Sequence, residues 1–308
     1  MHDVVVFYRL HLKTHRIFSK MRGLSHGRLT MILNVNNSMK RLLLLLLACS
    51  LLAACATSPT GRKQLMLISP ESAIVESKKA YLSTVNELGK NDKLVNDPAL
   101  SKRVATVTGR LVTVAIAKFP YTEKWEWSVA IVDEPDVVNA WCMAGGRMAV
   151  YTGLFDKLQL TDAEFAQIMG HEISHALANH TAEQMSTAMA TTMGVVAVGA
   201  MSDRPAIAMG GAAMAAKVAL SLPNSRTAEK EADQMGMEIA VLAGYDPDAA
   251  VSLWEKMAAQ GGGRPPEFLS THPAPGNREA ALAAMIPAMR ALNPTGKLAP
   301  VHPVQIVR

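Results

Sequence analysis

The chain has 308 residues, of which 49% are hydrophobic and 19% are charged, and no tract of low complexity, as is usual for a globular protein. A formal net charge of +5 would suggest a nucleic-acid partner. However, residues 1–54 hold eight Lys or Arg and one acid, whereas the other 254 residues hold 23 basic and 25 acidic residues, a net charge of −2. Because we expect the basic segment to be removed, we expect no nucleic-acid partner.

Residues 39–54 have the pattern of a bacterial lipoprotein signal peptide. A short positive start, Met39-Lys40-Arg41, precedes a largely apolar stretch of thirteen residues, 42–54. This length suits a signal-peptide core but is too short for a bilayer, which needs about 20 residues. The stretch ends in Leu52-Ala53-Ala54-Cys55, which resembles a lipobox, so we expect cleavage before Cys55 and a lipid on its thiol. The alternative is a buried helix that ends in Ala-Ala-Cys by chance. Residues 1–38 are then an upstream extension.

The mature chain is expected to form one domain that is held together by core packing. Cys142 has no partner once Cys49 is removed and Cys55 is lipidated, so no intramolecular disulfide is expected. The expected division is a tether at residues 55–68, a metallopeptidase domain at 69–290 and a C-terminal tail at 291–308.

Most of this domain is expected to be helical. Ser69 and Asp97 can each cap a helix that begins at the following proline. Thr161 and Glu164 can form a capping box for a helix that extends to about His180. Further helices are expected at 226–242 and 246–260 and from Asn277, the last with a kink at Pro287.

A short β region interrupts the helices. Apolar and polar residues alternate over 125–131, which is typical of a strand. Two further apolar segments, 137–143 and 147–152, flank Ala144-Gly145-Gly146, which predicts a hairpin turn. The predicted fold class is therefore α+β, a mostly helical single domain with a small antiparallel sheet.

Residues 187–222 are rich in Ala, Gly and Met and allow two interpretations. They could form two membrane-spanning helices, or a soluble helical hairpin or flap. The two halves are short and Lys217 is charged, both of which are unfavourable in a bilayer. We favour the hairpin or flap.

A candidate metal site begins with His171-Glu172-Ile173-Ser174-His175, inside the helix that Thr161 caps. Because four helical residues turn through about 400°, the two histidines project from one face, where their nitrogens can hold one ion. Glu172 lies beside the ion, where it can take a proton from a water held at the metal. The alternative is a pair of histidines that face solvent.

A catalytic zinc site needs a third protein ligand. Glu229 and Asp233 share one face of the next long helix, so one can ligate zinc while the other accepts a hydrogen bond from a ligating imidazole. We expect Glu229 to be the ligand and Asp233 its companion. The alternative is that Glu229 pairs with an Arg or Lys. In a continuous helix His180 points away from His175, so we expect it to lie at the surface or just behind the ligands. Glu231 is expected to be solvated.

These motifs resemble the gluzincin family that includes the CAAX prenyl endopeptidases, the HtpX heat-shock proteases and their periplasmic lipoprotein relatives. The resemblance spans residues 55–290 and implies that Glu229 is the third zinc ligand and Glu172 the general base. Integral-membrane relatives carry spanning helices between the two zinc motifs. One departure is Ala144, where relatives often have Pro. Further landmarks are Thr60-Gly61-Arg62-Lys63-Gln64-Leu65, Asn139-Ala140 ahead of Gly145-Gly146, and Ser270-Thr271-His272-Pro273 ahead of Arg278.

The predicted function is that of an endopeptidase with one Zn²⁺ per chain, which hydrolyses unfolded or misassembled envelope proteins. Because Ala56 rather than Asp follows the lipidated Cys55, we expect a lipid-anchored protein at the periplasmic face of a Gram-negative outer membrane. The outer-membrane assembly machinery is a candidate partner. The alternative is a chaperone-like assembly lipoprotein with a mainly structural zinc, but a closed structural site needs no base such as Glu172.

Two further groups of residues are candidates for the site. We expect an edge strand against which extended substrates pair, or, alternatively, an edge strand without a partner. Its residues are Asn139, Ala140, Trp141, Cys142 and Met143. His272, in a Thr-His-Pro loop, is a candidate zinc plug or oxyanion donor, and the alternative is that it only caps a turn.

Overall fold

The computed structural model describes residues 55–202, 206–207, 209–211, 222–260, 267–272 and 277–308, so the expected upstream extension and signal peptide lie outside the described residues. The helices are α4 (Pro70–Lys90), α5 (Pro98–Lys118), η1 (Pro120–Lys124), α6 (Gly153–Leu158), α7 (Asp162–Leu177), α8 (His180–Ala200), α10 (Leu222–Leu242), α11 (Ala249–Ala259), α12 (Glu267–Thr271) and α13 (Arg278–Arg290). The strands are β1 (Cys55–Thr57), β2 (Lys63–Leu65), β3 (Ser128–Val132), β4 (Ala140–Met143), β5 (Arg147–Tyr151) and β6 (Gln305–Val307).

The larger sheet has the strand order β4-β5-β3-β6. Strands β4 and β5 form the expected hairpin, in which Gly145 and Gly146 have φ of 89° and 79°, a region that other residues rarely adopt. β3 pairs in parallel with both β5 and β6. The α+β class is confirmed, but the sheet is mixed rather than antiparallel, because β5 lies between β4 and β3 and has the direction of β3. Strand β6 comes from the segment expected as a tail.

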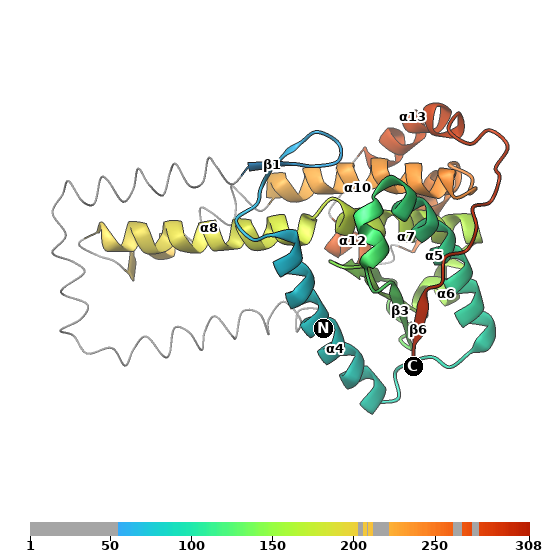
Figure 1. The fold of residues 1–308 in the computed structure, drawn as a ribbon, viewed down its shortest axis with the longest axis horizontal. Coiled ribbons are helices and arrows are strands. Elements are labelled where there is room, and N and C mark those ends of the chain that lie inside the picture. Colours follow the sequence, from blue (N-terminus) through green and yellow to red (C-terminus); the bar gives the residue numbers. More distant parts are fainter. Residues whose placement is uncertain (1–54, 203–205, 208, 212–221, 261–266, 273–276) are drawn as a thin grey trace.

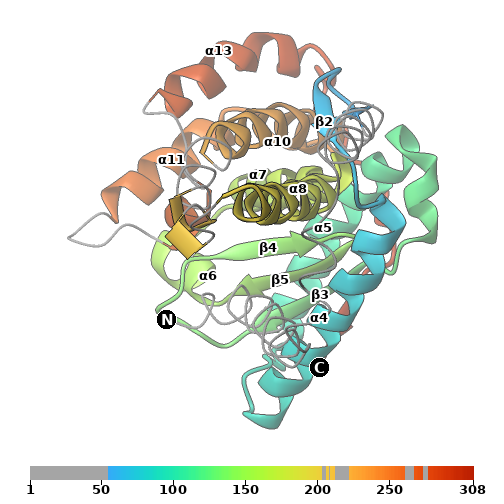
Figure 2. The same ribbon diagram turned by 90° about the vertical axis from the view of Figure 1, so that its left-hand side faces the viewer.

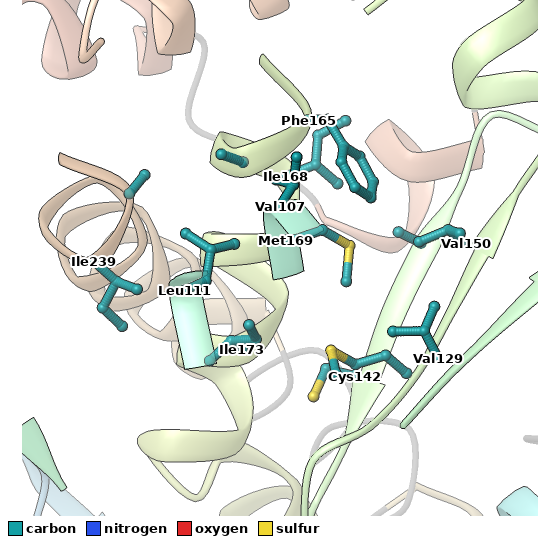
Figure 3. Close-up of a cluster of buried hydrophobic side chains, with 14 of the residues drawn as sticks. Val107, Leu111, Val129, Cys142, Val150, Phe165, Ile168, Met169, Ile173 and Ile239 are labelled. Carbon is teal, nitrogen blue, oxygen red and sulfur yellow. The ribbon is translucent and has the colours of Figure 1, made fainter. Parts of the chain in front are cut away.

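Helices cover both faces of this sheet (Figure 2). Both faces must be covered because the buried residues of β3 alternate between them. Val129 packs with Met169 and Ile173 of α7 in the main core (Figure 3). Ala130 packs with Tyr81 of α4 on the opposite face. Helices α5 and α10 contact α7 in turn, so α7 is surrounded by protein.

Helix α7 ends at Leu177, three residues before the predicted end. Asn179 adopts the left-handed conformation, with φ of 56°, which Asn tolerates better than most residues. This residue interrupts the helix, and α8 begins at His180 and extends away from the rest of the protein (Figure 1). The break therefore changes where His180 points.

The first part of the Ala-, Gly- and Met-rich segment is α8. Several of its large apolar side chains are exposed, among them Met189, Met193 and Val196. Within the part of the chain that is described, none of the helices has the length and apolar character needed to cross a membrane. Residues 203–205, 208 and 212–221 of the predicted hairpin lie outside the described residues.

The segment expected as a tether contains a small antiparallel hairpin, β1–β2. Gln64 in β2 is only 2% exposed, and its side-chain amide donates to the carbonyl of Ala178 and to the carboxylate of Glu183. This hairpin is thus packed against the junction between α7 and α8.

Candidate metal centre

The N-terminus of α7 is fixed by the predicted capping box. The Thr161 hydroxyl accepts from the backbone N–H of Glu164, whose carboxylate accepts from the N–H of Thr161. Lys256 also donates to Glu164. Two to three turns further on, His171 and Glu172 are buried, at 5% and 2% exposure, and the side chain of His175 is only 14% exposed. The two histidines are therefore not a solvent-facing pair.

Helix α10 approaches α7 close to this turn. A Cβ added to Gly170 would lie only 2.6 Å from the carbonyl oxygen of Gly236, so the two helices touch backbone to backbone. Any larger residue at either position would push them apart. This contact brings the carboxylates of Glu229 and Asp233, on α10, against His171.

His171, His175 and Glu229 present their ligand atoms to one point. Nε2 of His171 lies 3.0 Å from Nε2 of His175 and 3.3 Å from Oε2 of Glu229, and Nε2 of His175 lies 3.5 Å from Oε1 of Glu229. A tetrahedral zinc ion with bonds of about 2.0–2.1 Å has ligand atoms roughly 3.3 Å apart. The three side chains therefore fit a zinc ion.

His272 joins the same group. Its Nδ1 lies 3.2 Å from Nε2 of His171 and 3.2 Å from Oε1 of Glu229, at a fourth corner of the arrangement. The ring also stacks on Phe268 of α12, with centroids 4.6 Å apart. A role limited to capping a turn does not account for this position.

Asp233 and Arg278 support the ligands from behind. Oδ1 of Asp233 lies 3.0 Å from Nδ1 of His171, the nitrogen that faces away from the group of ligand atoms. The guanidinium of Arg278 donates to Asp233 and lies 3.5 Å from Oε2 of Glu229. Its face covers the ring of Trp254, at 4.2 Å from the centroid. Glu229 therefore does contact an Arg, and it also faces both histidines.

The charge states of the buried groups follow from these contacts. Burial lowers the pKa of His175 well below its ordinary value, and His171 adds to this effect, so the His175 ring is neutral. Burial alone would also lower the pKa of His171, but hydrogen bonds to Asp233 and Glu229 raise it to about 9. In the metal-free protein His171 therefore carries the proton that a metal ion would replace.

Glu172 lies beside the ligands, as predicted. Its Oε1 is buried and has no hydrogen-bond partner among the described residues, although Nε2 of His272 is 3.3 Å away. Burial raises the pKa of Glu172 above its ordinary value, which brings the carboxyl closer to the range of a general base at neutral pH. A carboxylate oxygen without a hydrogen bond in this place is suited to accepting a proton.

Two neighbouring residues differ from expectation: Glu231 is not solvated, and His180 does not point away from His175 but lies just behind it, the second of the two positions expected for it. Glu231 is 5% exposed rather than solvated, and its Oε2 lies 3.1 Å from Nε2 of His180. His180 is 2% exposed, and its Nδ1 lies 2.8 Å from Nδ1 of His175, because the left-handed Asn179 breaks the helix between the two histidines. The sequence contained one signal for the contact between His180 and Glu231. Arg62 belongs to the Thr60–Leu65 landmark, and its side chain binds Glu231.

The predicted edge strand lies next to the candidate centre. Strand β4 is at one end of the described sheet and packs against α7. The side chains of Ala140 and Cys142 belong to the core on the α7 face, whereas Trp141 and Met143 pack on the α4 face. Cys142 has a buried free thiol whose pKa is raised well above its ordinary value by burial and by Glu172.

The family model for peptidase family M48 matches residues 98–286, which is more than half of the chain and includes every candidate ligand. The chain belongs to peptidase family M48. Members of this family are zinc metallopeptidases, so the gluzincin resemblance read from the sequence is confirmed. Zinc is therefore the metal that the group of His171, His175, Glu229 and His272 is expected to bind in this M48 chain.

Curated relatives of this M48 chain come from mitochondria and from bacteria. The mitochondrial metalloendopeptidase OMA1 of Bos taurus is 32% identical over 240 residues, which cover 74% of the chain and 45% of the relative. OMA1 of Arabidopsis thaliana is 34% identical over 196 residues, 63% of the chain and 38% of the relative. The beta-barrel assembly-enhancing protease of Escherichia coli K12 is 27% identical over 203 residues, 63% of the chain and 40% of the relative. In each case the match spans less than half of the relative.

Proposed function

We propose that this chain is a zinc-dependent endopeptidase in which His171, His175 and Glu229 hold one Zn²⁺ ion. The observation that carries the proposal is the spacing of the three ligand atoms, 3.0 to 3.5 Å apart, which is that of a tetrahedral site. When bound, zinc would polarise the scissile carbonyl and lower the pKa of a water at the site. Membership of the M48 family supports this choice of metal.

In this proposal Glu172 moves the proton. Its Oε1 makes no hydrogen bond among the described residues and is therefore available to accept a proton from the attacking water. The same carboxyl, with a pKa raised by burial, then delivers that proton to the leaving amine. Asp233 would orient His171 through the contact to its Nδ1.

We also propose that His272 is a plug. Its Nδ1 takes the fourth corner beside His171 and Glu229, which a catalytic site leaves to water. In the described conformation water could enter only after the ring moves. A role as oxyanion donor requires the ring to move as well, and substitution of His272 distinguishes the two roles.

For substrate binding we propose β-strand addition along β4. Tyr151 donates its N–H to the carbonyl of Asn139, so in this antiparallel pair residues 139, 141 and 143 face β5 with their backbone groups. The N–H of Cys142 therefore points away from β5, toward the free edge. Pairing through the backbone would favour extended or unfolded segments with little sequence preference.

We place the enzyme at the periplasmic face of a Gram-negative outer membrane, with a lipid on Cys55. The lipobox-like sequence supports this, and Cys55 is exposed with a free thiol at the start of β1. The name of the Escherichia coli relative, which is 27% identical, refers to β-barrel assembly. Unfolded or misassembled envelope proteins are therefore the proposed substrates, and the outer-membrane assembly machinery a proposed partner. The proposed boundaries are removal of residues 1–54 and a peptidase domain at residues 69–290. The hairpin β1–β2 packs against this domain, and β6 adds a strand to its sheet.

The test compares Glu172→Gln with the wild-type chain and with Glu71→Gln, an exposed control in α4. Casein cleavage and bound zinc are measured on each protein. Glu172→Gln should cut more slowly by about 10²- to 10⁴-fold and keep one zinc per chain, while Glu71→Gln behaves as wild type. A Glu172→Gln protein that cleaves casein at the wild-type rate would overturn the proposal. A wild-type chain that does not cleave casein but prevents aggregation of unfolded protein would favour the chaperone-like alternative.

A further inference from the structure

A buried chain of polar side chains extends from the ligand His175 to the N-terminal hairpin. The Nδ1 atoms of His175 and His180 are 2.8 Å apart, and Nε2 of His180 is 3.1 Å from Oε2 of Glu231. His180 and Glu231 are both 5% exposed or less. None of these contacts is needed to bring the three proposed zinc ligands together.

Only one placement of protons satisfies this chain. His175 presents Nε2 to the metal position, so its Nδ1 carries the proton and donates it to Nδ1 of His180. His180 must then carry its proton on Nε2, where the carboxylate of Glu231 accepts it. The opposite tautomer of His180 would set two N–H groups against each other, and it would leave Glu231 without its donor. Glu231 thus selects the tautomer of His180 and, through it, that of His175.

The N-terminal hairpin holds Glu231 in place. Thr60 donates to Oε1 of Glu231 at 2.5 Å, and Nε of Arg62 donates to Oε2 at 2.9 Å. The two terminal nitrogens of Arg62 form a bidentate pair with Glu183 of α8, at 2.6 Å each. Arg62 therefore ties α8 and α10 together at the point where the His180–Glu231 contact forms.

We propose that the hairpin segment Thr60–Arg62 is a positioning part of the metal centre, which acts through Glu231 and His180 on the ligand His175. The other imidazole ligand, His171, has the same kind of support from Asp233 directly. Outer partners of this kind fix the ring of a ligating histidine and make it a stronger ligand, and their loss typically costs about tenfold to a hundredfold in metal affinity. The inference rests on the zinc site proposed above.

The experiment measures zinc affinity by chelator competition, and the visible spectrum of the cobalt-substituted chain, for Glu231→Gln in the full-length protein. The matched control is Glu164→Gln, a buried carboxylate at the start of α7 that contacts Lys256 and Ser252 but none of the chain of side chains described above. Glu231→Gln should lower zinc affinity by about tenfold to a hundredfold and shift the cobalt spectrum. Glu164→Gln should lower the unfolding temperature of the metal-free protein yet leave both metal readouts unchanged.

A second variant tests the hairpin itself and does not depend on whether Glu231→Gln folds. Arg62→Met, at a side chain that is 18% exposed, should lower zinc affinity by about threefold to tenfold. In the Glu231→Gln background it should add almost nothing, because Arg62 acts through Glu231. The inference would be overturned if both single variants kept wild-type zinc affinity and cobalt spectra, or if Glu164→Gln lost as much zinc affinity as they do. Either result would leave the proposed function intact. A wild-type chain that binds no zinc would overturn the proposed function as well.

Discussion

The α-carbon of Gly236 lies directly against the backbone of His171, where an added Cβ would be 2.6 Å from the backbone nitrogen of His171. This contact fixes the distance between the helix that carries two ligands and the helix that carries the third. Inside a helix, alanine is ordinarily favoured over glycine by roughly 0.5–1 kcal/mol. A loss of stability on Gly236→Ala would therefore report the close contact and not helix propensity.

We expect Gly236→Ala to destabilise the protein by about 1–3 kcal/mol and to lower zinc affinity by at least about tenfold, because the methyl group forces α10 away from α7. Gly194→Ala in α8 is the matched control, since no described atom lies within 4 Å of its added Cβ. That variant should be as stable as wild type or slightly more stable, with unchanged zinc affinity. Denaturant unfolding and chelator competition check both variants. An equal response of the two proteins would rule out the backbone contact as the cause.

Zinc affinity should rise with pH. In the folded, metal-free protein the pKa of His171 is raised to about 9, above its ordinary value near 6.5. The bound proton therefore stabilises the fold fully below pH 6.5, and this stabilisation is lost as the pH rises through 9. Zinc must displace this proton, so its affinity should increase about tenfold per pH unit between pH 7 and 8 and level off above 9. Calorimetry in buffers of different ionisation enthalpy should detect the release of one proton at pH 7.5.

Asp233→Asn provides the comparison for that pH dependence. It removes the carboxylate that raises the pKa of His171, so the increase of zinc affinity between pH 7 and 8 should become smaller. The same slope in wild type and variant would contradict the assignment of the proton to His171.

The sequence predicted the parts of this site that depend on local spacing. His171, Glu172 and His175 lie within one turn of helix, and Glu229 and Asp233 within another, so helical geometry alone orients each set. The capping box of Thr161 is equally local. These features could be predicted because each involves residues no more than four positions apart.

The parts that the sequence did not predict depend on long-range contacts or on a single backbone conformation. The burial of Glu231 depends on Arg62, 169 positions away. The orientation of His180 depends on the left-handed Asn179, and a lone Asn in a helical pattern is a weak signal. The approach of α10 to α7 requires Gly170 and Gly236 to meet, which neither glycine indicates alone.

If His272 is a plug, its removal should activate the enzyme. His272→Ala should raise basal casein cleavage, by roughly tenfold if about one molecule in ten is open in the wild type. Thr271→Ala is the control, because its hydroxyl contacts the carbonyls of Glu267 and Phe268 and not the ligands. A fall in kcat with unchanged zinc content would instead assign His272 to oxyanion binding. An unchanged rate would exclude both roles.

The edge-strand proposal predicts different effects from two substitutions at one position. Cys142→Pro removes the N–H that points to the free edge of β4, whereas Cys142→Ala removes the thiol and keeps the N–H. With an extended peptide substrate, Cys142→Pro should lower kcat/KM by at least about tenfold, since it loses one backbone hydrogen bond and prevents close pairing. Cys142→Ala should stay within about twofold of wild type, because small changes in a packed core are tolerated when the backbone is intact. Both proteins must retain zinc, so that binding and not the metal is tested. If the proline variant cleaves extended peptides as efficiently as the alanine variant, substrates do not pair with this edge.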